Sequence, residues 1–272
     1  MKEFRPLGNT LFPPVVKNLL IINGILFFAT YVFQSRFPIT EWLALTYFES
    51  PKFKVWQLIS HLFMHGNIGH LFSNMFALWI FGATVENFLG SKKFLQYYLL
   101  TGLGASILFM GVQYLEIHPV QKHAEAYEIN PNYQSFERFV EEDISSGYQA
   151  NYVEFVDYYK ANPNDTEVKR ASVTAVNNYA GKLLDSQVLG ASGAVFGILL
   201  AFGWLFPNSL IYIYFFFPMK AKYLVILYGA FELYNGIANN PGDNVAHFAH
   251  LGGMLIGFIL IKIWDIKRPG QY

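Results

Sequence analysis

The sequence predicts an all-α, polytopic membrane protein in which six transmembrane helices form a bundle and one polar loop is inserted. Two observations carry this prediction. Of the 272 residues, 53% are hydrophobic and only 14% are charged, whereas soluble domains carry about 25% charged residues. The apolar residues also fall into blocks of about 18–25, which are long enough to cross a bilayer core of roughly 30 Å as helices.

Charge and cysteine content exclude several classes of function. The formal net charge is zero, so no basic surface indicates binding to nucleic acid. The chain has no cysteine, which excludes disulfides, thiol nucleophiles and thiolate metal sites. Residues 1–18 are polar and lack a small-residue cleavage pattern, so we expect no removable signal peptide there.

The apolar blocks place the six transmembrane helices. Their predicted ranges are 16–35, 67–89, 93–115, 190–206, 221–237 and 246–264. "GSKKF" forms a tight turn between the second and third helices. The connection over residues 36–66 is aromatic and amphipathic, which predicts a segment partly embedded in the membrane interface.

Residues 118–186 break the apolar pattern, so the predicted six-helix core comprises residues 1–117 and 187–272. This acidic insertion carries eleven Asp and Glu residues against six Lys and Arg residues. "SFERFVEEDI" and "YVEFVDYYKA" have helical apolar spacing, which predicts a small helical unit in water. No catalytic pattern occurs in it, and we therefore expect a lid or spacer outside the membrane.

The positions of Lys and Arg predict the orientation, because these residues are enriched in cytoplasmic loops. They gather in the N-terminal tail (Lys2, Arg5), the 90–93 turn, the 207–222 connection and the C-terminal tail. Both termini are therefore expected in the cytoplasm, and residues 36–66, the insertion and "NGIANNPGDN" outside. Six helices without a seventh favour a bacterial inner membrane.

This orientation brings three polar clusters to the outer leaflet. "GNIGHLFSN" opens the second helix, "GASGA" the fourth and "AHFAHLGG" the sixth. Polar side chains inside a membrane are costly unless they have a partner or a function. Three helices with polar residues at one depth predict a functional site.

Ser192 and His250 are the candidate nucleophile and base of this site. Small residues repeat every four positions on the two helices that carry them: Gly193, Gly197 and Ala201 on the fourth, Gly253 and Gly257 on the sixth. Such faces let two helices approach closely, which would bring the hydroxyl and the imidazole within reach for a base-activated serine. Taken alone, "GASGA" is better explained by packing. A histidine at matching depth favours catalysis.

His70 and Asn74 are the candidate groups for stabilising an oxyanion. They lie four residues apart, so both project from one face of the second helix. An Asn amide supplies two N–H donors, a neutral imidazole supplies one, and backbone N–H groups near Ser192 can add to them. An interhelical hydrogen bond for Asn74 and an interfacial polar contact for His70 explain these residues equally well.

The seven histidines also suggest a metal site. "HLFMH" and "HFAH" are similar to pieces of the histidine boxes of di-iron membrane desaturases. Such boxes need more imidazoles close together, whereas His118 and His123 fall in the insertion, and no HExxH motif is present. We therefore expect no metal and no other cofactor, and structural roles for His61, His65 and His247.

Three segments together resemble the rhomboid intramembrane serine proteases: "HLFMHGNIGHLFSNMFALWIFGATVENFLGS", "GASGAVFG" and "AHFAHLGGMLIG", in the family's order. The resemblance covers the six-helix core and not the insertion. It implies that Ser192 is the nucleophile of a GxSG motif beginning at Gly190 and that His250 is its general base, without an acidic partner. By the same resemblance, His70 and Asn74 match oxyanion-stabilising positions, and Gly253 and Gly257 match the packing glycines.

Three further positions are interpreted through the resemblance. Glu86 matches a buried structural glutamate. Gln57 follows Trp56 where the family often has arginine, which is expected to remove hydrogen bonds that brace the interfacial loop. Phe196 replaces a tyrosine that stacks beneath the catalytic histidine, so the stacking is expected to survive.

The predicted function is an intramembrane serine endopeptidase that cleaves transmembrane protein substrates within the lipid bilayer. The alternative is a non-catalytic rhomboid-like protein that binds membrane clients. Such proteins typically lack the serine or the histidine, and this chain keeps both. A transporter would show inverted repeats and interrupted helices in corresponding halves, and neither is evident. The sequence does not indicate an oligomeric state.

Overall fold

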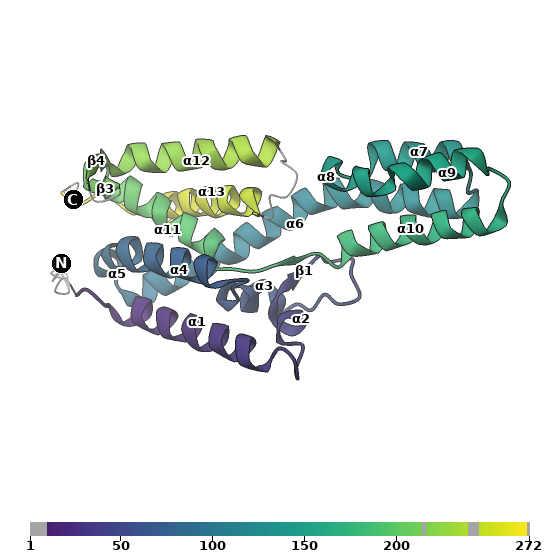
Figure 1. The fold of residues 1–272 in the computed structure, drawn as a ribbon. Coiled ribbons are helices and arrows are strands. Elements are labelled where there is room, and N and C mark those ends of the chain that lie inside the picture. Colours follow the sequence, from purple (N-terminus) through teal and green to yellow (C-terminus); the bar gives the residue numbers. More distant parts are fainter. Residues whose placement is uncertain (1–9, 214–215, 239–244, 271–272) are drawn as a thin grey trace.

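The computed structural model describes residues 10–213, 216–238 and 245–270. The fold of these residues is mostly helical, as predicted. Figure 1 shows its long axis: helix α6 (Ser91–Ile129) runs from a large group of helices at one end into a small bundle at the other. Helix α1 (Pro14–Phe33) begins, and helix α13 (His247–Ile263) ends, at the side of the large group that is far from the small bundle.

Helices occupy all six ranges predicted for the transmembrane segments. Besides α1, α6 and α13, they are the continuous run of α4 (Ile68–Ala77), the π-helical turn η2 (Leu78–Gly82) and α5 (Ala83–Leu89), then α11 (Ser192–Leu205) and α12 (Ala221–Ala238). Among the described helices, α1, the Ile68–Leu89 run and α6 are long and apolar enough to cross a membrane. Helices α11 and α13 are apolar but shorter.

The remaining elements are short or lie in the small bundle. The connection after α1 contains α2 (Ile39–Leu43), β1 (Leu45–Thr46), α3 (Gln57–Ser60) and η1 (His61–Phe63). The bundle holds α7 (Tyr133–Glu142), α8 (Ser146–Gln149), η3 (Ala150–Tyr152), α9 (Val153–Ala161) and α10 (Thr166–Leu184). Strand β2 (Gln187–Val188) pairs antiparallel with β1, and β3 (Leu210–Ile213) pairs with β4 (Phe217–Lys220).

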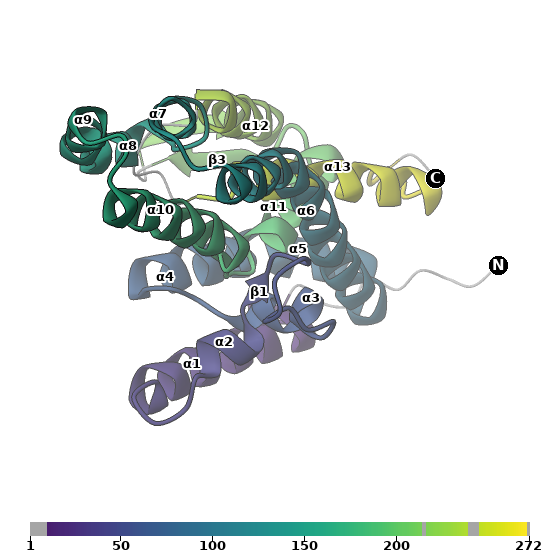
Figure 2. The ribbon, with the colours of Figure 1, turned by 90° about the vertical axis from the view of Figure 1, so that its right-hand side faces the viewer.

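Helix α11 lies within the large group, where α6, α11 and α13 all pack against one another (Figure 2). Most of its side chains are buried, and their neighbours form the main core together with residues of α1, α6 and α13. Buried members of this core include Val16, Leu78, Phe94, Tyr97, Ile198 and Ile261. Because α11 has no exposed face, its packing fixes the position of Ser192 at its first turn.

The glycines predicted to pack the fourth and sixth helices do meet. A Cβ atom added to Gly253 would overlap the carbonyl group of Gly193, and one added to Gly257 would lie 3.3 Å from the Cα of Gly197. A Cβ on Gly193 would also lie 2.7 Å from the Cβ of Ala105 on α6. The lack of side chains at these glycines therefore sets the separation of α11 from both neighbours.

The third predicted helix is longer than expected. We predicted an end at residue 115, but α6 continues to Ile129 and includes Pro119, which cannot donate the usual backbone hydrogen bond. The prediction was wrong because loss of apolar character marks where a helix can leave the membrane, not where its backbone hydrogen bonds stop. The polar residues after 117 therefore extend the same helix.

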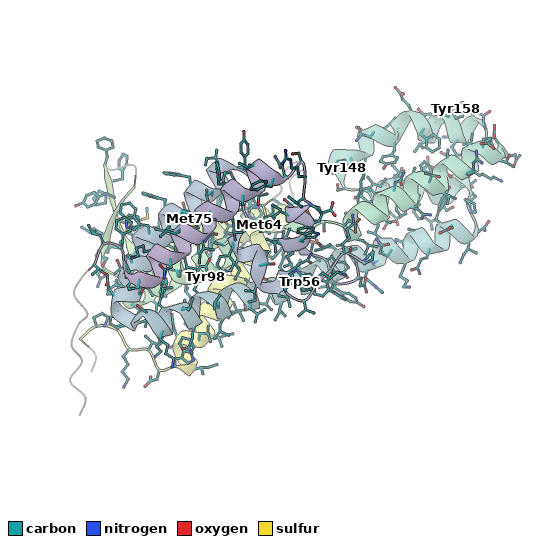
Figure 3. The ribbon with its side chains drawn as sticks, turned by 90° about the horizontal axis from the view of Figure 1, so that it is seen from below. Trp56, Met64, Met75, Tyr98, Tyr148 and Tyr158 are labelled. Atoms are coloured by element: carbon teal, nitrogen blue, oxygen red, sulfur yellow. The ribbon has the colours of Figure 1, made fainter. Side chains whose placement is uncertain are left out.

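The helical spacing predicted within the insertion is confirmed by α7 and α9. The bundle has its own apolar core, which includes Val120, Tyr127, Phe136, Phe139, Tyr159 and Val176. Asn132 caps α7 by accepting a hydrogen bond from the Ser135 N–H, and Asp165 caps α10 in the same way through the Glu167 N–H. Tyr148 and Tyr158 are exposed on the bundle, whereas Met64 and Tyr98 are buried in the large group (Figure 3).

Candidate active site

The chain that leads to Ser192 is held by the connection that follows α1. Leu45 pairs with Val188 across the β1–β2 ladder, and the Gly190 N–H donates a hydrogen bond of 3.0 Å to the His61 carbonyl. Ser192 then opens α11. Two separate segments therefore brace the turn immediately before this serine.

Gly190 is required in that turn for two reasons. Its φ of +123° lies in a region that L side chains rarely adopt. A Cβ atom there would also lie 2.7 Å from Cε1 and Nε2 of the His70 ring. The candidate oxyanion residue His70 thus packs directly against the turn that precedes Ser192.

Asn74 lies one helical turn after His70 and is buried. Its amide donates a hydrogen bond of 3.1 Å to the His70 carbonyl, which leaves a second N–H on the same amide. The Asn67 side chain caps α4 by accepting a hydrogen bond from the His70 N–H. The cap and the amide fix the first turn of α4, on which both candidate oxyanion residues stand.

The imidazole of His250 packs on the first turns of α11. Its ring stacks on Phe196 with a centroid separation of 4.2 Å and an interplanar angle of 5°. Phe196 follows Ser192 by four residues, so it lies one turn further along the same face of α11. The expected stacking is confirmed, and it orients a buried His250 ring beside the helix that Ser192 begins.

The sequence interpretation missed Glu232, which contacts His250. The carboxylate Oε2 of Glu232 lies 2.8 Å from Nδ1 of His250 and 2.6 Å from Nδ1 of His247. An acidic residue in the middle of the apolar stretch 221–237 was the available signal, because ionisable residues inside membrane helices usually have a function. The family resemblance implies no acidic partner for His250 and therefore does not predict this contact.

The expected loss of hydrogen bonds at Gln57 is wrong. The Gln57 side chain is fully buried and makes four hydrogen bonds within the interfacial connection. Its carbonyl oxygen accepts from the N–H groups of Thr46 and Lys54, and its amide donates to the carbonyls of Glu41 and Lys52. An amide that both donates and accepts replaces the bracing expected of arginine.

His61 has the structural role expected of it. Its Nδ1 lies 2.7 Å from the Gln57 carbonyl and its Nε2 lies 3.0 Å from the Ser106 hydroxyl. Burial lowers the pKa of His61 to about 4, so the ring is neutral near pH 7. Because a carbonyl can only accept, Nδ1 carries the proton. His61 and Ser106 also line a small cavity that reaches Ser192.

The structure brings few of the histidines close enough together to bind one metal ion. Within residues 10–213, 216–238 and 245–270, three or more His, Asp or Glu ligand atoms come together only at Glu232, His247 and His250. The oxygen-to-nitrogen separations there are those of direct hydrogen bonds, shorter than the roughly 3.3 Å between two ligands of one zinc ion at about 2.0–2.1 Å. The two "HLFMH" histidines do not join this group, and the buried ring of His65 has no hydrogen-bond partner among the described residues.

Comparison with protein families gives a match that covers more than half of the chain. The model of the rhomboid domain matches residues 52–117 and 170–264. The chain belongs to the rhomboid family. Rhomboid proteins are membrane proteins, and the family generally comprises intramembrane serine proteases. The rhomboid match leaves out residues 118–169, which cover most of the bundle.

Three relatives illustrate the range of the family. RHOMBOID-like protein 12, mitochondrial, of Arabidopsis thaliana is 27% identical over 259 residues, which are 95% of this chain and 60% of that protein. An uncharacterised mitochondrial rhomboid protein of Schizosaccharomyces pombe is 25% identical over 223 residues, 80% of this chain and 53% of its own. Rhomboid protease GlpG of Klebsiella pneumoniae is 35% identical over 66 residues, 24% of each chain. This chain thus spans 60% or less of each of these three relatives.

The predicted bacterial inner membrane is wrong. Of the three relatives named above, the two that match most of this rhomboid chain are mitochondrial proteins, which points to a mitochondrial membrane. The number of apolar blocks does not identify a membrane, and a bias of Lys and Arg only orders the loops relative to one another. Two of the residues behind the cytoplasmic assignment of the termini, Lys2 and Arg5, also lie outside the described part of the chain, as do residues 239–244.

Proposed function

We propose that this rhomboid protein is an intramembrane serine endopeptidase that hydrolyses transmembrane protein substrates through Ser192 and His250. The observation that supports it is the close crossing of α11 and α13. Glycines form the crossing, and the His250 ring stacks on Phe196, one turn from Ser192. Helix crossings built for packing alone do not need a buried imidazole beside the only serine of the motif.

The proposed reaction follows from these groups. Ser192 Oγ attacks the carbonyl carbon of the substrate peptide bond while His250 Nε2 accepts the hydroxyl proton. His70, Asn74 and backbone N–H groups at the start of α11 donate hydrogen bonds to the oxyanion. The His250 imidazolium then protonates the leaving amine. A water molecule, deprotonated by His250, hydrolyses the acyl-enzyme and restores Ser192.

In the proposed topology, all six helices of the rhomboid core cross the lipid bilayer, and residues 118–186 lie outside it between the third and fourth. A peptide bond inside a helix is shielded by its own backbone hydrogen bonds. Substrate helices must therefore unwind locally before Ser192 can attack, and we expect small or helix-breaking residues near the cut. The substrates are transmembrane proteins whose identity the fold does not specify.

A serine-directed probe and a cleavage assay test this proposal. The purified protein is treated with a fluorophosphonate and, separately, incubated with a panel of model transmembrane substrates whose products are mapped by mass spectrometry. A protease labels at Ser192 and cuts at least one substrate. The alternative, a rhomboid protein that only binds membrane clients, would retain the substrates uncut and leave Ser192 unlabelled.

The oxyanion residues are tested by truncation. Asn74→Ala and His70→Ala each remove one side-chain donor, and we expect kcat to fall by about 10²–10³ for Asn74→Ala, as when a comparable donor is removed elsewhere. We expect a similar fall in kcat for His70→Ala, or a smaller one where a water molecule or a backbone N–H replaces the ring as donor. Kinetics on one substrate, after each variant is shown to be folded, measures this. Near-wild-type kcat in both variants would exclude a side-chain oxyanion hole.

The bundle is tested by deletion. Gln121 donates a hydrogen bond of 2.7 Å to the Ala180 carbonyl, so the two chain positions are adjacent. Replacing residues 122–179 with a short Gly/Ser linker removes most of the separate apolar core and leaves the β1–β2 ladder intact. We expect fluorophosphonate labelling of Ser192 to persist, with altered selectivity among substrates. A folded deletion variant that no longer labels would show that the bundle belongs to the active site.

A further inference from the structure

We propose that Glu232 is a positioning residue for His250, so that the site works as a carboxylate–imidazole–hydroxyl arrangement rather than as a dyad. This inference rests on the proposed protease function. It concerns one buried contact: the carboxylate on α12 accepts a hydrogen bond from Nδ1 of His250 on α13.

The contact selects one tautomer of His250. An ionised carboxylate can only accept hydrogen bonds, so Nδ1 of His250, 2.8 Å from Oε2 of Glu232, carries the ring proton. In a neutral imidazole the other nitrogen, Nε2, then holds a free lone pair. That nitrogen is the one required to take the proton of Ser192.

Two contacts together fix the ring. Stacking on Phe196 sets the plane of the His250 imidazole, and the hydrogen bond to Glu232 sets its rotation within that plane. When the imidazole becomes an imidazolium during attack, the Glu232 charge also stabilises it. In serine proteases with a buried aspartate, the carboxylate has the same two effects.

The position of Glu232 is built into the packing of α12 on α13. Gly236 lies one turn after Glu232, and a Cβ atom there would be 3.3 Å from the Cβ of His247. Because Gly236 has no side chain, α12 can approach α13 closely enough for the Glu232 carboxylate to reach His250. Glu232 Oε2 also lies 2.6 Å from Nδ1 of His247, and all three side chains are buried. His247 therefore orients the carboxylate that orients His250.

This arrangement accounts for a charge that would otherwise be costly. A carboxylate inside a membrane helix is retained where it has partners or a function. Packing of α12 alone would be served as well by a glutamine of the same shape. A carboxylate differs from that glutamine because it can only accept a hydrogen bond from Nδ1 and because its negative charge stabilises the imidazolium.

The experiment compares Glu232→Gln with Glu86→Gln. Glu86 is also a buried glutamate, but its carboxylate accepts hydrogen bonds from the N–H groups of Val15 and Val16 at the start of α1 and from the Ser91 hydroxyl. For Glu232→Gln we expect kcat to fall by about 10² or more with KM unchanged, because the amide can donate to Nδ1 and move the ring proton to Nε2. For Glu86→Gln we expect a lower melting temperature with kcat unchanged.

A second measurement can be made on the wild type and does not require Glu232→Gln to fold. The ¹⁵N chemical shifts of His250 in mildly alkaline buffer, assigned by difference from His250→Ala, report which nitrogen carries the proton. We expect protonated Nδ1 in the wild type and protonated Nε2 in Glu232→Gln. Protonated Nε2 in the wild type would overturn the inference.

The outcomes separate this inference from the proposed function. If the wild type cleaves a substrate, Ser192→Ala does not, and Glu232→Gln keeps kcat within about threefold of the wild type, Glu232 has no positioning role and the protease remains. A wild type that neither cleaves nor labels overturns both. A loss of kcat in Glu232→Gln with a changed tautomer supports the inference.

Discussion

Replacing Ser192 with alanine is expected to reduce substrate cleavage to the uncatalysed background. The hydroxyl is the only nucleophile at the start of α11, and the chain has no cysteine to replace it. Because Ser192 opens the helix and its backbone is held by the β1–β2 ladder and the Gly190 hydrogen bond, alanine should leave the fold intact. The test is kcat in proteoliposomes on one cleavable substrate, with melting temperature as the measure of folding.

His250→Ala should lose almost as much activity, because without a base the Ser192 hydroxyl stays protonated near neutral pH. His123→Ala is the matched control: its exposed ring, in the bundle, pairs with Asp143. It should leave kcat unchanged. Cleavage by Ser192→Ala that clearly exceeds the background would place the nucleophile elsewhere and end the assignment.

The second large effect is expected at the helix crossing. Gly253→Val adds a branched side chain where even a Cβ atom overlaps the carbonyl group of Gly193. The neighbour is backbone, not a flexible side chain, so α11 and α13 must separate. Separation moves Ser192 away from His250, and we expect loss of cleavage together with a lower melting temperature. Thermal unfolding in detergent and kcat on the same substrate measure both.

Gly111→Val is the control for that prediction. Gly111 lies on an exposed face of α6, and a Cβ atom added there would meet no neighbouring atom of the described residues within 4 Å. The same substitution therefore has open space at this position, and activity and stability should stay near the wild type. A Gly253→Val variant that unfolds and turns over like this control would show that the two helices are farther apart in solution.

The helical core could be predicted from the sequence because apolar length is a strong signal. The same signal stops at the membrane boundary, which is why the end of α6 was misplaced by more than a dozen residues. The β3–β4 hairpin was also missed, since residues 207–222 were treated as a plain connection. Hydropathy does not report a hairpin whose strands are four residues long.

The candidate site could be predicted only in part. Ser192 and His250 stand out because each belongs to a patterned motif, and the glycines around them have a regular spacing. Glu232 belongs to no motif, and its partner lies on another helix. The prediction for Gln57 was wrong for a different reason. A glutamine in place of arginine suggests lost hydrogen bonds, but the loop folds around the Gln57 amide, which makes four. Such contacts depend on tertiary structure.

The continuity of α6 has a mechanical consequence. One unbroken helix lines the core beside α11 and then forms part of the bundle. The bundle's return strand, β2, runs straight into the turn before Ser192, and Asp185 at its foot pairs with Ser50 and Lys52. The segment between the bundle and the turn before Ser192 is therefore short and held by contacts at both ends. We expect that a displacement of the bundle, which includes the end of α6 at Ile129, would reach this turn through β2.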